Sequence, residues 1–186
     1  MNSYSLALFL HIVGAMGFFL ALGLEWFGLW QLRGARHSQE VRAWMGLLKS
    51  VRRGGFASML AVVISGVYMM ATTWGRVPWL IVTVGALVMV IVLALALSGP
   101  RMAAIGRALV TEQGALSQTF HRLANHPLLW ISIQTRVAIT LGIVLLKTVK
   151  PDVSGSLLII GVAIVLGLAS TLPMPRRERA HEGAAH

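Results

Sequence analysis

Five long apolar runs, separated by short polar or basic segments, dominate the pattern of this chain. The runs cover Tyr4–Trp30, Phe56–Trp74, Trp79–Ser98, Leu128–Val149 and Val153–Thr171. Each is close to or above the roughly 20 residues that a helix needs to cross a hydrocarbon core about 30 Å thick. The pattern therefore predicts an all-α integral membrane bundle of five transmembrane helices.

The segment between the first two runs has a different periodicity. Within residues 35–53 the apolar positions recur at helical spacing, with basic residues elsewhere, which predicts an amphipathic helix on the inner membrane surface. Gly54 and Gly55 are expected to separate this helix from the second span. A further short interfacial helix is expected within 99–127, and His126, just before Pro127, is expected to cap the fourth span. The positions that carry the amphipathic pattern are Val41, Trp44, Leu47, Leu48 and Val51.

Composition supports a membrane protein, and the distribution of charge predicts its orientation. Hydrophobic residues make up 56% of the 186 residues and charged residues 12%, which is unlike an ordinary soluble domain. Twelve of the 16 Lys and Arg residues fall on one side of the predicted spans and three on the other. Because such residues are enriched in cytoplasmic loops, we expect an N-out, C-in topology.

The formal charge of +10 then faces the anionic inner leaflet of the bilayer and needs no nucleic-acid partner. Residues 1–172 are expected to form a single transmembrane domain, and residues 173–186 a disordered cytoplasmic tail. The chain has no cysteine, which excludes disulfides and thiolate metal sites.

Among the ionisable residues inside the predicted spans, three stand out: His11, Glu25 and Arg136. Such residues are costly in a bilayer and therefore indicate a function or a specific partner. Arg136 should lean toward the N-terminus of its helix, and so toward the depth of Glu25 on the first span. An intramembrane ion pair between Glu25 and Arg136 is the preferred interpretation. It serves either to fix helix packing or to line a proton or anion pathway.

His11 is the candidate cofactor ligand. Histidine with methionine can ligate haem iron, and imidazole with thioethers suits Cu(I), so haem b and copper are the two candidate cofactors. Tyr68, Met69 and Met70 on the second span are expected at a similar depth, as second ligands or pocket residues. The alternative for His11 is a hydrogen bond to a backbone carbonyl or to a Ser or Thr during helix packing. No hydrolase triad, phosphate-binding loop or dinucleotide fingerprint occurs in the sequence.

The first helix, with Leu10-His11-Ile12-Val13-Gly14-Ala15, resembles the opening of several small bacterial membrane families. These are the copper-resistance D-type proteins, the membrane-type protoporphyrinogen oxidases and a related uncharacterised membrane family. The last of these is the most similar, on Arg136 and the turn Lys150-Pro151-Asp152. Asn125-His126-Pro127 extends the likeness to the oxidases. The resemblance implies a bacterial inner membrane protein in which His11 binds haem.

Two classes of function are left open, and the sequence does not decide whether the protein is an enzyme. In the first, the protein holds haem or copper near His11 and has a redox or cofactor-handling role, with a respiratory or redox partner or a second copy of the chain. In the second, it is a non-enzymatic transporter or assembly protein that uses Glu25 and Arg136 for packing or for a substrate path.

Overall fold

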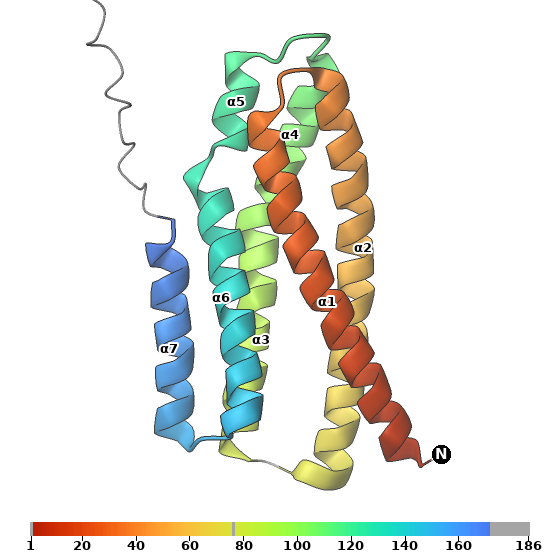
Figure 1. Ribbon diagram of the computed structural model, residues 1–186, viewed down its shortest axis with the longest axis vertical. Helices are drawn as coiled ribbons and strands as arrows, with labels where there is room; N and C mark the ends of the chain where they lie inside the picture. Colours follow the sequence, from red (N-terminus) through yellow and green to blue (C-terminus); the bar gives the residue numbers. More distant parts are fainter. Residues whose placement is uncertain (1, 76, 172–186) are drawn as a thin grey trace, which may run out of the picture.

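The structure is a computed structural model that describes residues 2–75 and 77–171, and every regular element in that part of the chain is helical (Figure 1). The expected disordered tail, residues 173–186, lies outside these ranges. In chain order the elements are α1 (Ser3–Gly34), α2 (Ser38–Met69), the π-helical segment η1 (Met70–Trp74), α3 (Pro78–Leu93), the π-helical segment η2 (Ala94–Ser98), α4 (Gly99–Thr111), α5 (Gln118–Ala124), α6 (Pro127–Val149) and α7 (Val153–Ala169).

Four helical stretches are long and apolar enough to cross a membrane, and a shorter apolar helix accompanies them. The long stretches contain 32 to 36 residues each. The shorter one is α7, whose 17 residues correspond to about 26 Å of helix, close to the lower limit for a span. The all-helical bundle and its five apolar helices therefore agree with the sequence prediction and are consistent with a multi-pass membrane protein.

Successive long helices run in opposite directions, so the connections gather at two ends of the bundle. The α1–α2 turn and the α4–α5 connection lie at one end, at the top of Figure 1. We call this the basic end because the predicted amphipathic segment and residues 99–127 supply its arginines and Lys49. The N-terminus and the α2–α3 and α6–α7 connections lie at the other end.

The predicted amphipathic helix is part of α2 and does not form a separate surface helix. α2 runs without interruption from Ser38 to Met69, and Gly54 and Gly55 lie inside it (Figure 1). Its buried positions Val41 and Leu48 pack against α1 and α4 in the core of the basic end. The amphipathic pattern was read correctly as a helix. The predicted break of the helix at Gly54-Gly55 was wrong. Gly55 instead lies inside α2, where its lack of a side chain allows close packing against Ala21 of α1.

The segment after the third apolar run also continues as helix instead of stopping at Gly99-Pro100. Proline has no N–H to donate to the carbonyl four residues earlier, here that of Ala96, and its ring crowds that carbonyl. The helix widens to i→i+5 bonding over η2, where Gly99 N–H donates to Ala94 O. The Arg101 guanidinium donates to the carbonyls of Ala96 and Leu97 at 3.4 and 2.8 Å. Helix α4 therefore continues α3 through a π-helical segment.

Residues 99–127, where one short helix was expected, form two helices, α4 and α5, separated by residues 112–117. The side chain of His126 accepts a hydrogen bond from Leu128 N–H and caps α6, as predicted. Phe120 of α5 and Ile105 of α4 are fully buried in the hydrophobic core of the basic end.

α1 and α2 pack against each other through small residues. A Cβ added at Gly14 would lie 3.0 Å from the carbonyl oxygen of Ser58, and one at Gly55 would lie 2.9 Å from the Cβ of Ala21. Such contacts let two backbones approach closely, which is how helices associate where no water drives them together. α6 packs on α3 and α7 as the other half of the bundle.

This packing predicts opposite effects of alanine at two adjacent glycines. Gly55→Ala should lower the free energy of unfolding by roughly 1–3 kcal/mol, because the new methyl overpacks against Ala21. Gly54→Ala meets no atom within 4 Å and should be neutral or stabilise α2 by up to about 1 kcal/mol. Titration with SDS in mixed micelles, followed by circular dichroism, measures both. Equal effects of the two substitutions would contradict the packing role of Gly55.

Candidate functional site

Glu25 of α1 and Arg136 of α6 form a two-pronged salt bridge inside the bundle. Arg136 Nη1 donates to Glu25 Oε2 at 3.0 Å, and Nη2 donates to Oε1 at 2.9 Å. Both residues are buried, with 8% and 4% of their surfaces exposed. This is the pairing that the sequence predicts. A charge placed in this environment without its partner would be strongly destabilising, so the two side chains depend on each other.

The π-helical segment η2 supplies a further acceptor for the arginine. Arg136 Nη2 also lies 3.3 Å from Ser98 Oγ. Ser98 donates to Ser132 Oγ at 2.9 Å, and Ser132 donates to the Leu93 carbonyl at 3.0 Å. Two of the three guanidinium nitrogens are thus partnered, but the buried Nε of Arg136 has no hydrogen-bond partner within the described residues. π-Helical segments occur often at functional sites, and here one is built into the shell around Arg136.

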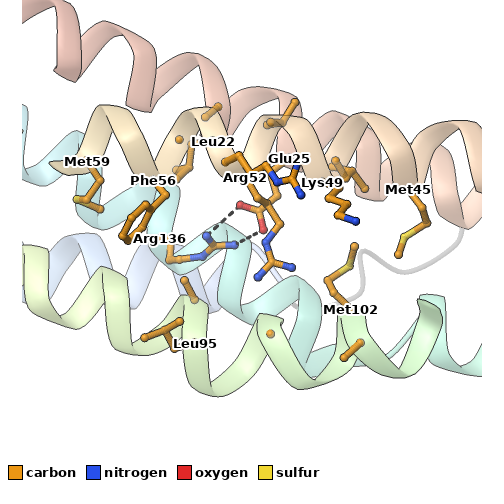
Figure 2. Close-up of a pocket in the computed structure, with 18 of the residues that line it drawn as sticks. Leu22, Glu25, Met45, Lys49, Arg52, Phe56, Met59, Leu95, Met102 and Arg136 are labelled. Carbon is orange, nitrogen blue, oxygen red and sulfur yellow. Dashed lines mark hydrogen bonds and ion pairs between the residues drawn. The ribbon is translucent and has the colours of Figure 1, made fainter. Parts of the chain in front are cut away.

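The ion pair stands on the wall of a half-open cavity of about 920 Å³. The cavity lies between α1 and α2 on one side and α3, η2 and α4 on the other, and Figure 2 shows the pair at its centre. Its volume lies in the upper part of the usual range for ligand pockets. Small residues on the α3–α4 wall help to leave this space open, namely Ala94, Gly99, Ala103 and Gly106.

Cationic side chains outnumber carboxylates around the cavity. Lys49, Arg52 and Arg53 of α2 line it together with Arg136, and Glu25 is the only acidic lining residue in the described part of the chain. Within residues 2–75 and 77–171, no hydrogen bond or ion pair is formed by Lys49, Arg52 or Arg53. Because Arg136 already neutralises Glu25, the three α2 cations give the cavity a net positive charge.

His11 lies outside this cavity, between α1, α2 and α6, and both of its ring nitrogens have partners. Nδ1 is 3.1 Å from the Val62 carbonyl oxygen and 3.1 Å from Ser65 Oγ, while Nε2 is 2.5 Å from Lys147 Nζ. The carbonyl oxygen can only accept, so Nδ1 carries the proton and Nε2 accepts from the lysine. This is the packing arrangement that the sequence analysis kept as the alternative to metal binding.

Lys147 is the residue of this cluster that sequence reasoning missed. It was counted as one of the three basic residues of the outer connectors, although the fourth apolar run, Leu128–Val149, contains it. Helix α6 ends at the same residue and carries Lys147 within it. A signal was present, because Lys147 is eleven residues, about three turns, beyond Arg136 and therefore shares its helical face. The side chain turns inward to reach His11.

Neither ring nitrogen of His11 is open to a metal in this arrangement. The α2 residues next to its ring are Val62, Ser65 and Gly66, one turn before Met69. Met69 is buried and Tyr68 is 40% exposed. No group of three or more His, Cys, Asp or Glu residues that could hold a metal ion occurs in the described ranges. The haem and copper predictions for His11, Tyr68, Met69 and Met70 thus have no support from this geometry and stay predictions.

The dependence of Glu25 and Arg136 on each other predicts a strongly non-additive mutant cycle. Glu25→Leu or Arg136→Met alone should cost roughly 3–5 kcal/mol of stability, because the remaining charge is left buried. The double substitution should recover most of that loss, because both charges are replaced by apolar side chains of similar volume. SDS titration of the four proteins measures the cycle. If the double variant loses as much free energy of unfolding as the two single variants lose together, the two side chains do not depend on each other and this account is excluded.

The contact between His11 and Lys147 predicts a smaller coupling. His11→Ala and Lys147→Ala should couple by about 0.5–1.5 kcal/mol, the range measured for polar contacts between membrane helices. Thr148→Ala is the matched control, since Thr148 is exposed and bonds only to the Val144 carbonyl of its own helix. Its effect should add to that of His11→Ala within about 0.5 kcal/mol. Additivity of the His11 and Lys147 variants would show that the contact contributes nothing.

Comparison with known proteins finds no match to any family model, to any curated protein or to any solved structure. The resemblance of the first helix to bacterial membrane families therefore stays a prediction, and the function must be argued from the geometry of the site.

Proposed function

We propose that this chain is a non-enzymatic membrane protein that takes up a ligand in the cavity beside the Glu25–Arg136 pair, as a carrier or an assembly protein does. The observation that carries the proposal is the position of the pair. A purely structural salt bridge is best enclosed by packed side chains, whereas this one borders about 920 Å³ of open space.

Two features of Arg136 support a ligand at this wall. The residue is 4% exposed, yet its Nε has no partner in the described part of the chain. A buried N–H without an acceptor is costly, which favours a bound group or water that supplies one. In addition, η2 places Ser98 against the guanidinium at the cost of regular helix geometry.

The rival class, a redox protein with haem or copper at His11, receives less support. Its proposed ligand is engaged on both nitrogens by Val62, Ser65 and Lys147. A metal at Nε2 would have to displace the lysine. The arrangement instead ties α1, α2 and α6 together at the end opposite the basic end.

We also propose that the chain lies in a bacterial inner membrane, as the resemblance of its first helix implies, with its N-terminus outside and its C-terminus inside. Two observations support this orientation: the bias of Lys and Arg toward the basic end, and the alternation of helix directions in the bundle (Figure 1). The basic end then faces the cytoplasm, and the cavity lies in the inner half of the bilayer.

Filling the cavity should remove the ligand. We expect native mass spectrometry of the protein, extracted in mild detergent, to show a bound small molecule that Ala103→Trp loses. Ala103 lines the cavity wall, so a large side chain there occupies the space. Val110→Trp on the same helix is the control, because Val110 is 75% exposed and does not line the cavity.

An adduct that persists in Ala103→Trp, or a wild-type protein without any adduct, would overturn the proposal. So would a Soret absorption band in the wild type that disappears in His11→Ala, which would favour the haem class. Circular dichroism of each variant separates ligand loss from misfolding.

A further inference from the structure

We infer that the ligand of the cavity is an anionic phospholipid of the inner leaflet. Its phosphate lies at Lys49 and Arg52, and its acyl chains lie against Phe56 and Met59. This inference rests on the proposed function, because it names the class of ligand for the same site.

Charge is the first argument. Four cationic side chains and one carboxylate line the cavity, and the carboxylate is already held by Arg136. The unpartnered cations Lys49, Arg52 and Arg53 therefore have no acidic partner within the described residues. Lys and Arg donors of this kind are suited to phosphate oxygens. All three side chains are exposed, so an anionic ligand can contact them where the cavity opens, whereas a cationic ligand would be repelled.

The chemical character of the side chains that line the cavity also changes along its length. On α2, one stripe at spacings of three and four residues faces it. Figure 2 shows the order along the cavity: Met59 and Phe56 toward one end, Arg52 beside the ion pair, Lys49 further along, and Met45 beyond it. The cations thus lie between two apolar parts of the lining, and the acyl chains are assigned to the part with Phe56 and Met59, which lies away from the basic end. The stripe consists of Met45, Lys49, Arg52, Phe56 and Met59.

The mouth of the cavity opens toward the surroundings of the bundle at membrane depth. Phe56 and Leu95 line it and are 72% and 68% exposed. Both lie in predicted spans, Phe56 at the start of the second and Leu95 near the end of the third, so the mouth lies where acyl chains are the solvent. An amphiphile can enter sideways from the bilayer and contact this apolar part of the opening with its acyl chains, whereas a soluble anion has no group that would bind there.

Lys49 and Arg52, which would bind the headgroup, lie at the depth of the inner interface of the membrane in the proposed orientation. Lys49 and Arg52 precede Phe56 by two turns and one turn of α2, toward the basic end. In the proposed orientation this level is the inner interface, where lipid phosphates are found. Attraction of basic residues to the anionic leaflet brings the lipid to the same place.

The test measures lipid binding to the purified protein by native mass spectrometry. Phosphatidylglycerol and phosphatidylcholine with the same acyl chains are titrated into four proteins: wild type, Ala103→Trp, Lys49→Gln/Arg52→Gln and Arg107→Gln/Arg122→Gln. The last is the charge-matched control, because Arg107 and Arg122 are exposed, do not line the cavity and sit at the same basic end. Glycerol 3-phosphate is added as a soluble competitor.

We expect the wild type and the Arg107/Arg122 variant to bind phosphatidylglycerol about tenfold more tightly than phosphatidylcholine or better. Lys49→Gln/Arg52→Gln should lose that preference, and Ala103→Trp should lose the binding itself. Glycerol 3-phosphate should not compete, because the acyl chains supply part of the affinity.

Equal binding of the two lipids by the wild type would overturn the inference, and so would an equal loss in both double variants, which would indicate general surface attraction. Competition by glycerol 3-phosphate at comparable concentration would assign the site to a soluble phosphate. If Ala103→Trp removes an adduct that phosphatidylglycerol does not displace from the wild type, the lipid inference fails and the proposed function stands.

Discussion

The buried pair of Glu25 and Arg136 is the constraint on which the rest of the bundle depends. A lone charge inside a membrane helix is expensive, and two opposite charges in register are tolerable only if they meet with good geometry. The two-pronged contact provides that geometry and joins α1 to α6. Through Ser98 and Ser132 it also includes the π-helical segment η2, so three separate stretches of the chain converge on one guanidinium.

Small residues decide where the bundle is tight and where it is open. At the α1–α2 interface, Gly14 and Gly55 let the backbones approach until no additional methyl fits. On the α3–α4 wall, Ala94 and Ala103 face α2 without filling the space between them, and a cavity results. Small residues thus allow close contact between α1 and α2 but leave a cavity between α2 and the α3–α4 wall. The difference depends on how far apart the rest of the bundle holds each pair of helices.

The bundle contains two polar clusters with different characters. At one end, His11, Ser65 and Lys147 satisfy one another and tie three helices together. Nearer the basic end, the Glu25–Arg136 pair borders open space with unpartnered cations beside it. The first cluster has the properties of packing and the second those of a binding site. This contrast favours the cavity beside Arg136, and not His11, as the position of a binding site.

The sequence alone determined the helical class, the apolar helices and the pairing of Glu25 with Arg136. Hydropathy and helical periodicity are local properties, and the cost of a buried charge leaves few partners to choose from. The continuity of α2 through Gly54-Gly55 goes with its packing against α1 at Gly55, which no local pattern contains. The passage of α3 into α4 at Pro100 is a local adjustment, through π-helical bonding and the Arg101 side chain, that the sequence analysis did not expect. The contact of Lys147 with His11 and the cavity itself were decided by the tertiary structure, because both depend on which helices become neighbours and how closely they approach.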